Sequence, residues 1–336
     1  MLILTHRDVQ DALRGQEVAV LRAVEDAYIA HAAGGSSLPH SVFLRFPDEP
    51  RNRIIALPAY LGGEQPIAGI KWISSFPANI DRGLERASAA VILNSLETGR
   101  PLAFLEGSTI SAWRTAAGAA LAARLLPATT DGNGVTVLGC GVINFAILRF
   151  LHHVVPGLTE VTAYDTQPGR AERLRERCAA DLPDLTVRVE HDLATALAKN
   201  TLVSVATNAL QPHLDFSGLV PGTLILHVSL RDVLPEAIVT AVNVVDDLDH
   251  VFRANTSVHL AEQQVGNRDF VAATIGELAA RGAAADRDPS RITVVSPFGL
   301  GILDLAVASL VVATAKARGL GTAVDNFLPT AETNHD

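Results

Sequence analysis

A glycine turn followed by an acidic residue is the clearest chemical signal in the sequence. Gly139 and Gly141 stand between an apolar run and a stretch of helical character. Gly139 permits a tight turn, and Gly141, which has no Cβ, lets the backbone approach a pyrophosphate at a helix N-terminus. Asn144 replaces the third glycine of the usual pattern. Asp165 lies 26 residues after Gly139, near the spacing of about 20 expected of a ribose-binding acid. Its carboxylate would repel a 2′-phosphate, so the pattern favours NAD over NADP.

Two cations stand inside apolar stretches. Lys71 lies between Ile70 and Trp72 in a strand-like pattern, so it points either to solvent or into a site. Arg114 lies in a helix of small residues, which is expected to pack closely, although a place on the helix surface stays open. Both side chains are suited to binding a carboxylate.

Asp232 follows the expected strand 223–228. Ligands of open parallel sheets bind outside the carboxyl ends of the strands, so Asp232 is placed to face a nicotinamide. A carboxylate there can accept a proton during oxidation of a C–N bond and hydrolysis of the product. The alternative is a helix cap before Leu234-Pro235-Glu236. We expect no metal site, because His152-His153 is more typical of a surface pair, and we interpret Cys140 as a packed thiol without a partner base.

The elements that position these residues fall into two groups. Residues 5–14 and 17–33 have helical spacing, the period then changes to that of strands, and a helix follows over 108–126. The expected strands of this first group are 42–46, 53–57, 66–75 and 87–96. From about residue 131, strands alternate with helices, which is the pattern of a doubly wound parallel sheet.

These patterns predict an α/β protein with a Rossmann domain over 128–299. The other domain, of α+β type, comprises 1–127 and 300–330, because the last long helix, over 300–317, is expected to return to it. Residues 326–336 are expected to form a loose tail.

The composition excludes several classes of protein. The 336 residues are 48% hydrophobic and carry a net charge of −9, which argues against a disordered chain and against a nucleic-acid binder. No apolar run is long enough for a membrane span, and the N-terminus lacks the features of a signal peptide. Two cysteines cannot form a disulfide framework or a four-ligand zinc site, and they suit the cytoplasm.

The chain resembles the ornithine cyclodeaminase/μ-crystallin family over almost its whole length. The stretches that carry the resemblance are Leu57-Pro58-Ala59, Gly69-Ile70-Lys71, Phe76-Pro77-Ala78-Asn79, Glu97-Thr98-Gly99-Arg100-Pro101, Arg114-Thr115-Ala116-Ala117, Gly139-Cys140-Gly141 and Arg231-Asp232. Further stretches are similar to the branch of N-(2-amino-2-carboxyethyl)-L-glutamate dehydrogenases; they are 74–83, 85–88, 140–145 and 229–232. That branch makes 2,3-diaminopropionate for siderophores and peptide antibiotics.

The resemblance implies a homodimer that uses NAD to oxidise the secondary amine of a substrate with several carboxylates. Hydrolysis of the imine would give 2,3-diaminopropionate and 2-oxoglutarate. It implies that Asp232 and Lys71 are catalytic, and that Lys71, Arg114, Arg231, Gly299 and either Arg45 or Arg53 bind substrate. The cofactor positions that it implies, together with those of the glycine turn, are Ser88, Arg114, Gly139, Gly141, Val142, Ile143, Asn144, Asp165, Thr207, Val228, Ser229 and Phe298.

Three other functions stay open within this resemblance. The first is an ornithine cyclodeaminase, but Ser229-Leu230-Arg231 replaces the Gly-Gly that usually precedes the aspartate there. The second is an imine reductase or amino-acid dehydrogenase that uses NADPH, against which Asp165 argues. The third is a non-catalytic NAD-binding protein of the μ-crystallin kind, against which the presence of both Lys71 and Asp232 argues.

Overall fold

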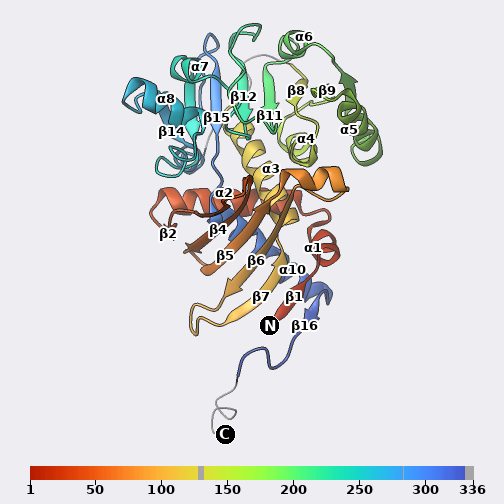
Figure 1. The fold of residues 1–336 in the computed structure, drawn as a ribbon, viewed down its shortest axis with the longest axis vertical. Helices are drawn as coiled ribbons and strands as arrows, with labels where there is room; N and C mark the ends of the chain where they lie inside the picture. Colours follow the sequence, from red (N-terminus) through yellow and green to blue (C-terminus); the bar gives the residue numbers. More distant parts are fainter. Residues whose placement is uncertain (128–131, 283, 330–336) are drawn as a thin grey trace. The chain divides into compact units, whose positions relative to one another are not determined.

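The computed structural model describes residues 1–127, 132–282 and 284–329, and the chain divides into two compact units (Figure 1). Unit 1 comprises Met1–Arg114 and Leu300–Asp336, and unit 2 comprises Thr115–Gly299. The chain passes from one unit to the other within helix α3 (Ser108–Leu125). Part of the expected domain boundary, 128–131, and the end of the expected tail, 330–336, lie outside the described residues.

Unit 1 contains a mainly antiparallel sheet in the order β16-β1-β7-β6-β5-β4-β2, with β3 paired to β4. Helix α10 (Gly301–Arg318) packs on β4, β5 and β6, and helices α1 (His6–Leu13) and α2 (Glu17–Ala32) pack against α10. In Figure 1, α10 lies behind these strands. The strands are β1 (Leu2–Leu4), β2 (Ser36–Ser37), β3 (Val42–Phe46), β4 (Glu49–Leu61), β5 (Ile67–Ser75), β6 (Ala87–Asn94), β7 (Pro101–Glu106) and β16 (Thr322–Ala323). A 3₁₀ helix, η1 (Pro77–Arg82), follows β5.

Two glycines let α10 approach the sheet closely. A Cβ at Gly301 would lie 3.2 Å from both the carbonyl oxygen of Leu57 and the Cβ of Ala59. A Cβ at Gly69 would lie 2.2 Å from the carbonyl oxygen of Ile92 and 3.0 Å from a methyl group of Leu305. Because real Cβ atoms do not come so close to backbone, the pairing of β5 with β6 requires glycine at residue 69, and the packing of α10 on β4 favours glycine at residue 301.

Unit 2 contains a parallel sheet in the order β10-β9-β8-β11-β12-β15-β13-β14. The strands are β8 (Gly134–Leu138), β9 (Glu160–Tyr164), β10 (Thr186–Val189), β11 (Leu202–Val205), β12 (Leu224–His227), β13 (Val242–Val245), β14 (Val271–Thr274) and β15 (Thr293–Ser296). The helices are α4 (Val142–Val154), α5 (Pro168–Asp181), α6 (Leu193–Leu197), α7 (Pro235–Thr240), α8 (Ser257–Val265) and α9 (Ile275–Ala280). The order of strands reverses direction at β8, so the crevice expected to bind a ligand opens at the carboxyl ends of β8 and β11.

The predicted fold class is confirmed, and the long elements lie close to their expected positions. Several short elements carry no clear signal in the sequence, among them β7, β14 and α9. Such segments hold only four to six residues, too few for hydrophobic periodicity to separate strand from helix. In the part of the chain that the structure describes, no helix combines the length and the apolar character that crossing a bilayer needs.

Candidate functional site

The glycine turn joins β8 to α4 with a geometry that suits a phosphate group. Gly139 has a φ of 86°, and a Cβ there would lie 2.4 Å from the carbonyl oxygen of Ala206. A Cβ at Gly141 would meet nothing within 4 Å, which leaves open space over the turn. Gly141 is the N-cap of α4 and supplies no side-chain cap, so the first amides of the helix, from Val142 and Ile143, are available to an anion.

Asp165 lies directly after β9 and is tied to this turn. Its Oδ2 accepts a hydrogen bond of 2.8 Å from the backbone N–H of Cys140, and its Oδ1 accepts one of 2.9 Å from Gln167. Each carboxylate oxygen keeps a further lone pair that can accept from a hydroxyl. The carboxylate therefore stands beside the glycine turn, at the position predicted for a ribose-binding acid.

The side chain of Asn144, a residue that the sequence predicts at the cofactor, supports the glycine turn. The residue is fully buried. Its Nδ2 donates to the carbonyl oxygens of Leu138 and Gly139 at 2.9 and 2.6 Å, and its Oδ1 accepts from Ser204 at 2.7 Å. The polar atoms of the Asn144 side chain thus hold the loop in shape. In the usual pattern the third glycine has this position and allows close packing of helix and strand.

Asp232 is buried among hydroxyl groups near the carboxyl end of β12. Ser229 donates to its Oδ2 and Thr207, which follows β11, donates to its Oδ1. Burial alone would raise the pKa of Asp232, but hydrogen bonds to His227, Ser229 and Thr207 outweigh it and hold the pKa below its ordinary value. The carboxylate is therefore ionised at neutral pH and able to accept a proton. Thr207 and Ser229, predicted as cofactor positions, are both hydrogen-bond partners of Asp232.

His227 lies behind this carboxylate and is fully buried. Its Nε2 lies 3.1 Å from the backbone nitrogen of Asp232, which donates to it, and 3.5 Å from Oδ2 of the same residue. Its Nδ1 lies 3.3 Å from the Oγ of Ser296 on the neighbouring strand. The two ring nitrogens of His227 thus connect the loop of Asp232 to the end of β15.

The loop around Asp232 is fastened at two further places. Leu230 has a φ of 68°, and its carbonyl oxygen accepts from Ser257 at 2.7 Å. Arg231, predicted to bind substrate, donates from Nη2 to the carbonyl oxygen of Ala254 at 2.8 Å. One arm of this guanidinium thus holds the loop in place.

The late loop of unit 2 is held by the buried carboxylate of Asp246, to which no role was assigned from the sequence. Asp246 follows β13 and accepts from the backbone N–H groups of Phe298 and Gly299 at 2.9 and 2.6 Å. Burial raises the pKa of Asp246, although these hydrogen bonds favour its charged form. Phe298 and Gly299, both predicted site positions, are therefore fixed at the carboxyl end of β15, the same edge of the sheet as Val228 and Asp232.

Lys71 points into unit 1 and not to solvent, which decides between the two alternatives. Its side chain is 2% exposed and its Nζ lies 2.6 Å from Oδ2 of Asp304 and 3.2 Å from the Oγ of Ser111. Arg114 donates from Nε to Oδ1 of the same Asp304 at 3.2 Å. Burial first, and the nearby Arg114 second, lower the pKa of Lys71 to about 8, against the opposing effect of Asp304.

Arg45 and Arg53 are cross-strand neighbours on β3 and β4, and Arg53 is in turn paired with Ser75 at the end of β5. Because residues two apart share a face of a strand, Ser75 and Arg53 lie on the same face of the sheet as Lys71. Arg86, to which we assigned no role from the sequence, donates from Nη1 to the Oγ of Ser75 at 3.0 Å. Several cations therefore gather along this face.

Ser88 lies on the opposite face of the same sheet. It pairs with Ser74 across β5 and β6, and the two hydroxyl oxygens are 2.8 Å apart. Both side chains alternate with those of Ser75 and Ala87. Within unit 1, Ser88 is thus on the other side of the sheet from Lys71.

The residues that we set aside show ordinary packing roles. His152 lies 3.5 Å from Asp184 and its ring contacts that of His153. Burial raises the pKa of the Cys140 thiol to about 12, and Asp165 adds to this effect, so the thiol is not a nucleophile at neutral pH. Among the described residues, no group of three or more His, Cys, Asp or Glu side chains is placed to hold a metal ion.

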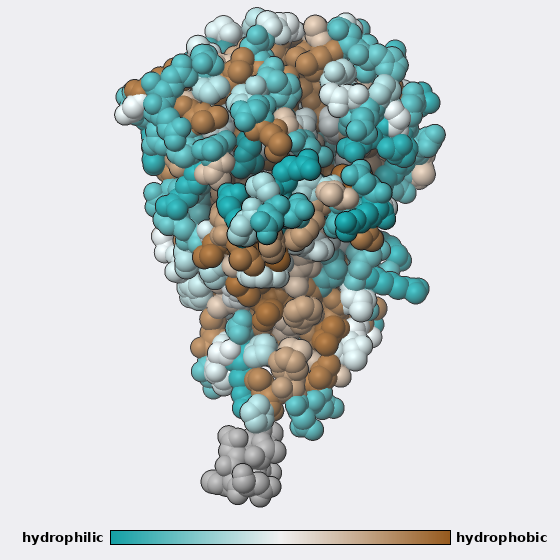
Figure 2. Space-filling view, viewed as in Figure 1, coloured by the Kyte–Doolittle hydropathy of each residue, from teal (hydrophilic) through white to brown (hydrophobic). Residues whose placement is uncertain are grey.

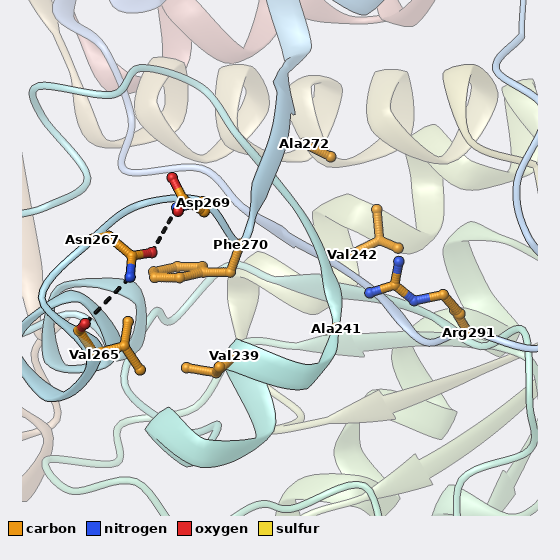
Figure 3. A pocket seen from close by; sticks show the side chains of 9 residues that line it. All are labelled: Val239, Ala241, Val242, Val265, Asn267, Asp269, Phe270, Ala272 and Arg291. Atoms are coloured by element: carbon orange, nitrogen blue, oxygen red, sulfur yellow. Dashed lines mark hydrogen bonds between the residues drawn. The ribbon is translucent and has the colours of Figure 1, made fainter.

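A cavity of about 380 Å³ lies elsewhere in unit 2, at the amino ends of β13, β14 and β15 (Figure 3). The opposite ends of these strands carry the candidate site. In Figure 3 the ring of Phe270 lies beside Asn267, with Val239 below it, and Asn267 is hydrogen-bonded to Val265 and Asp269. The polar side-chain atoms of Asn267 at the edge of the cavity thus form hydrogen bonds with neighbouring residues at that edge.

Asp304 and His227 are the site residues most clearly missed from the sequence. Asp304 is the one charged residue among the first fifteen of α10, which is otherwise rich in Ala, Val and Leu. Asp304, like Arg114, is a single charge in an apolar stretch of helix, and this pattern is visible in the sequence. His227 carries no comparable signal, since a histidine ending an apolar strand is common in cores.

Comparison with known proteins adds evidence from sequence and fold. The model of the ornithine cyclodeaminase/mu-crystallin family matches residues 1–319. The N-((2S)-2-amino-2-carboxyethyl)-L-glutamate dehydrogenase of Staphylococcus aureus is 30% identical over 97% of this chain and 99% of its own. The fold is similar to that of Δ1-pyrroline-2-carboxylate reductase from Thermococcus litoralis, solved with NADH and L-proline, at a TM-score of 0.89, with 25% identity over 96% of this chain and 100% of the other. An archaeal alanine dehydrogenase dimer with bound NAD has a TM-score of 0.86 and 29% identity over 97% of this chain and 99% of its own.

Proposed function

Because the chain belongs to the ornithine cyclodeaminase/mu-crystallin family, we propose that it oxidises N-(2-amino-2-carboxyethyl)-L-glutamate with NAD. The chain is an NAD-dependent oxidoreductase that acts on the CH–NH group of amino acids or imines. Addition of water to the imine then gives 2-oxoglutarate and 2,3-diaminopropionate, with NADH and a proton as the other products. The diamino acid would serve the synthesis of siderophores or peptide antibiotics in the cytoplasm.

The residues of the glycine turn fit the cofactor. The open space over Gly141 and the uncapped amides of Val142 and Ile143 suit a pyrophosphate, and Asp165 suits a ribose. The chemistry that bound NAD would supply is the acceptance of a hydride from the glutamyl Cα of the substrate. The protein contributes the placement of the substrate and the handling of its protons.

Asp232 is the residue that handles the proton in this proposal. The amine must lose a proton as its Cα–H bond breaks, and Asp232 is an ionised carboxylate at neutral pH. Its contacts with Ser229 and Thr207 fix its orientation. Lys71 binds a substrate carboxylate while charged, and after losing its proton it can accept one from the water that attacks the imine.

The choice of substrate is carried by one observation, the gathering of cations in unit 1. Lys71 and Arg114 share one carboxylate partner, Asp304, which leaves one net positive charge. Arg53 and Arg86 lie toward the end of β5 beside Ser75. A substrate with three carboxylates matches this set better than alanine, proline or ornithine, each of which has one.

Absorbance at 340 nm tests the proposal. Purified protein with NAD and N-(2-amino-2-carboxyethyl)-L-glutamate is expected to form NADH, 2-oxoglutarate and 2,3-diaminopropionate in equal amounts. Ammonia and proline from ornithine without net NADH would assign the protein as a cyclodeaminase. NADH from alanine, or oxidation of NADPH by a cyclic imine, would assign one of the other activities, and cofactor binding without any turnover would leave a binding protein.

A second copy of the chain is the partner that we propose for unit 1. One face of its sheet is covered by α10, whereas the other carries exposed apolar side chains, and Figure 2 shows brown residues over this region. These residues are Val42, Leu44, Tyr60, Trp72, Leu102 and Phe104. Exposed apolar surface of this extent is typical of a protein interface, and the similar archaeal alanine dehydrogenase is described as a dimer.

A further inference from the structure

Asp304 is a fully buried carboxylate whose contacts come from elements far apart in the sequence. It lies in the first turns of α10, where the helix dipole favours a negative charge. Its Oδ2 is 2.6 Å from the Nζ of Lys71 on β5, and its Oδ1 is 3.2 Å from the Nε of Arg114 on α3. A buried carboxylate is strongly unfavourable unless it is paired, so these two contacts explain why it is tolerated.

We propose that Asp304 is a positioning residue for the reaction proposed above. It holds Lys71 and Arg114 side by side and keeps Lys71 charged, so that Lys71 and Arg114 together bind one substrate carboxylate. The inference rests on that proposed function. It assigns to Asp304 no contact with the substrate.

The charges around Lys71 show why such a residue is needed. The charged groups that act on Lys71 are Arg114 from α3 and Asp304 from α10. The two neighbouring strands place the apolar Leu57 and Val91 opposite it. Without Asp304, the ammonium group would be buried next to a guanidinium with no anion to balance either charge, and it would release its proton.

The number of charges also fits the ligand. Lys71, Arg114 and Asp304 together carry one positive charge. This charge balances the single negative charge of one substrate carboxylate. Two unbalanced cations would repel one another, and a neutral Lys71 would leave only Arg114. Asp304 thus lets two donors converge on one carboxylate without the repulsion between them.

The position of Asp304 is set by the close packing of its helix. Gly301 lies against Leu57 and Ala59 of β4, and Leu305 lies over Gly69 of β5. These contacts lie on either side of Asp304 along the helix, and they place that part of α10 in close contact with β4 and β5. A carboxylate on a more distant helix would not reach the Nζ of Lys71 on the strand below.

Direct titration of Lys71 tests the inference without any substrate. The sequence contains three lysines, Lys71, Lys199 and Lys316, and the last two are exposed. Protein labelled with ¹³C at lysine Cε therefore gives three signals, of which two serve as internal references. In the wild-type chain the Lys71 signal is expected to titrate near pH 8.

Two variants are expected to move this midpoint in opposite directions. Asp304→Asn removes the balancing charge and lowers the midpoint by about one pH unit or more, whereas Arg114→Met removes the repelling charge and raises it. Ser111→Ala removes an uncharged contact of Lys71 and leaves the midpoint within about 0.3 units. A midpoint in Asp304→Asn equal to that of the wild type would overturn the inference, as would equal shifts in Asp304→Asn and Ser111→Ala. If Asp304→Asn does not fold, a midpoint unchanged in Arg114→Met overturns it instead.

Binding of 2-oxoglutarate in the presence of NADH tests the link to the substrate. We expect affinity to fall about tenfold or more in Asp304→Asn at pH 8, and the loss to shrink at pH 6, where Lys71 regains its proton. A purely structural role would weaken binding equally at both pH values. A shifted Lys71 midpoint in a protein that oxidises none of the candidate substrates would refute the proposed function and leave the effect of Asp304 on Lys71 in place.

Discussion

The backbone N–H of Cys140 donates a hydrogen bond of 2.8 Å to Oδ2 of Asp165. This contact joins the glycine turn after β8 to the end of β9. The turn expected to bind the pyrophosphate and the carboxylate expected to bind the ribose therefore fix each other's position. Replacement of Asp165 therefore affects both the discrimination between cofactors and the shape of the turn.

Asp165→Ala is expected to weaken NADH binding about tenfold or more and to reduce the preference over NADPH, because it removes the acceptor of the ribose hydroxyls and the charge that repels a 2′-phosphate. Fluorescence titration with both reduced cofactors measures the two dissociation constants. Glu160→Gln, at the amino end of the same strand β9, is the control and is expected to change neither. An unchanged ratio of the two constants in Asp165→Ala would show that the ribose assignment is wrong.

Asp232→Asn is expected to lower kcat about 100-fold or more and to change NAD affinity only a few-fold, since the amide cannot accept the proton of the amine. Steady-state rates of NADH formation give kcat, and equilibrium titration gives the affinity. Turnover equal to that of the wild type would exclude Asp232 as the proton acceptor.

Ser229→Ala is expected to raise the pKa of Asp232, because the Ser229 hydroxyl is one of the groups that hold it low. The proton acceptor must be ionised to work, so the acidic limb of kcat/KM moves to higher pH, by about 0.5 to 1 unit for the loss of one hydrogen bond. The pH profile of kcat/KM measures this shift. Ser217→Ala, in an exposed turn with Asp215, is the control. A lower rate with the limb at its original pH would contradict this role of Ser229.

Trp72→Glu is expected to convert the proposed dimer to a monomer, since it places a charge in the middle of the exposed apolar face of unit 1. Sedimentation velocity measures the mass in solution. Val18→Glu on α2, also an exposed apolar residue but outside that sheet, is expected to keep the dimer. Equal masses for Trp72→Glu and the wild-type dimer would place the interface elsewhere.

Asn144→Ala is expected to reduce the free energy of unfolding by about 2 to 3 kcal/mol, because it removes the hydrogen-bond partner of the buried Ser204 hydroxyl and of the partly buried Gly139 carbonyl, and one of the two donors to the Leu138 carbonyl. Urea unfolding followed by circular dichroism measures the loss. Asn267→Ala, on an exposed loop, is expected to change stability by less than about 0.5 kcal/mol. A similar small effect for Asn144→Ala would mean that the turn is held by its backbone alone.

The sequence predicts best what depends on local pattern. Alternation of strands and helices from β8 to β12 and the turn at Gly139 are visible there because each is encoded within a few residues. The partner of Lys71 is not, because Asp304 is brought to it by the packing of α10 on β5. The burial of Asn144 is likewise set by Ser204 on β11, which no local pattern relates to the glycine turn. The surroundings of Lys71 and Asn144 thus depend on contacts between elements that are distant in the sequence.

The order of the chain has a consequence for how the protein is made. Asp304 follows Lys71 by 233 residues, and the whole of unit 2, Thr115–Gly299, is synthesised between them. During synthesis, the strands of unit 1 therefore lack their covering helix, α10, until that helix has left the ribosome. Unit 2, which is continuous, can fold during this interval, whereas the surroundings of Lys71 are completed last. A premature stop after residue 299 would consequently leave the proposed NAD-binding unit complete and release a chain in which the sheet of unit 1 is uncovered and Lys71 has lost both its cover and its carboxylate partner.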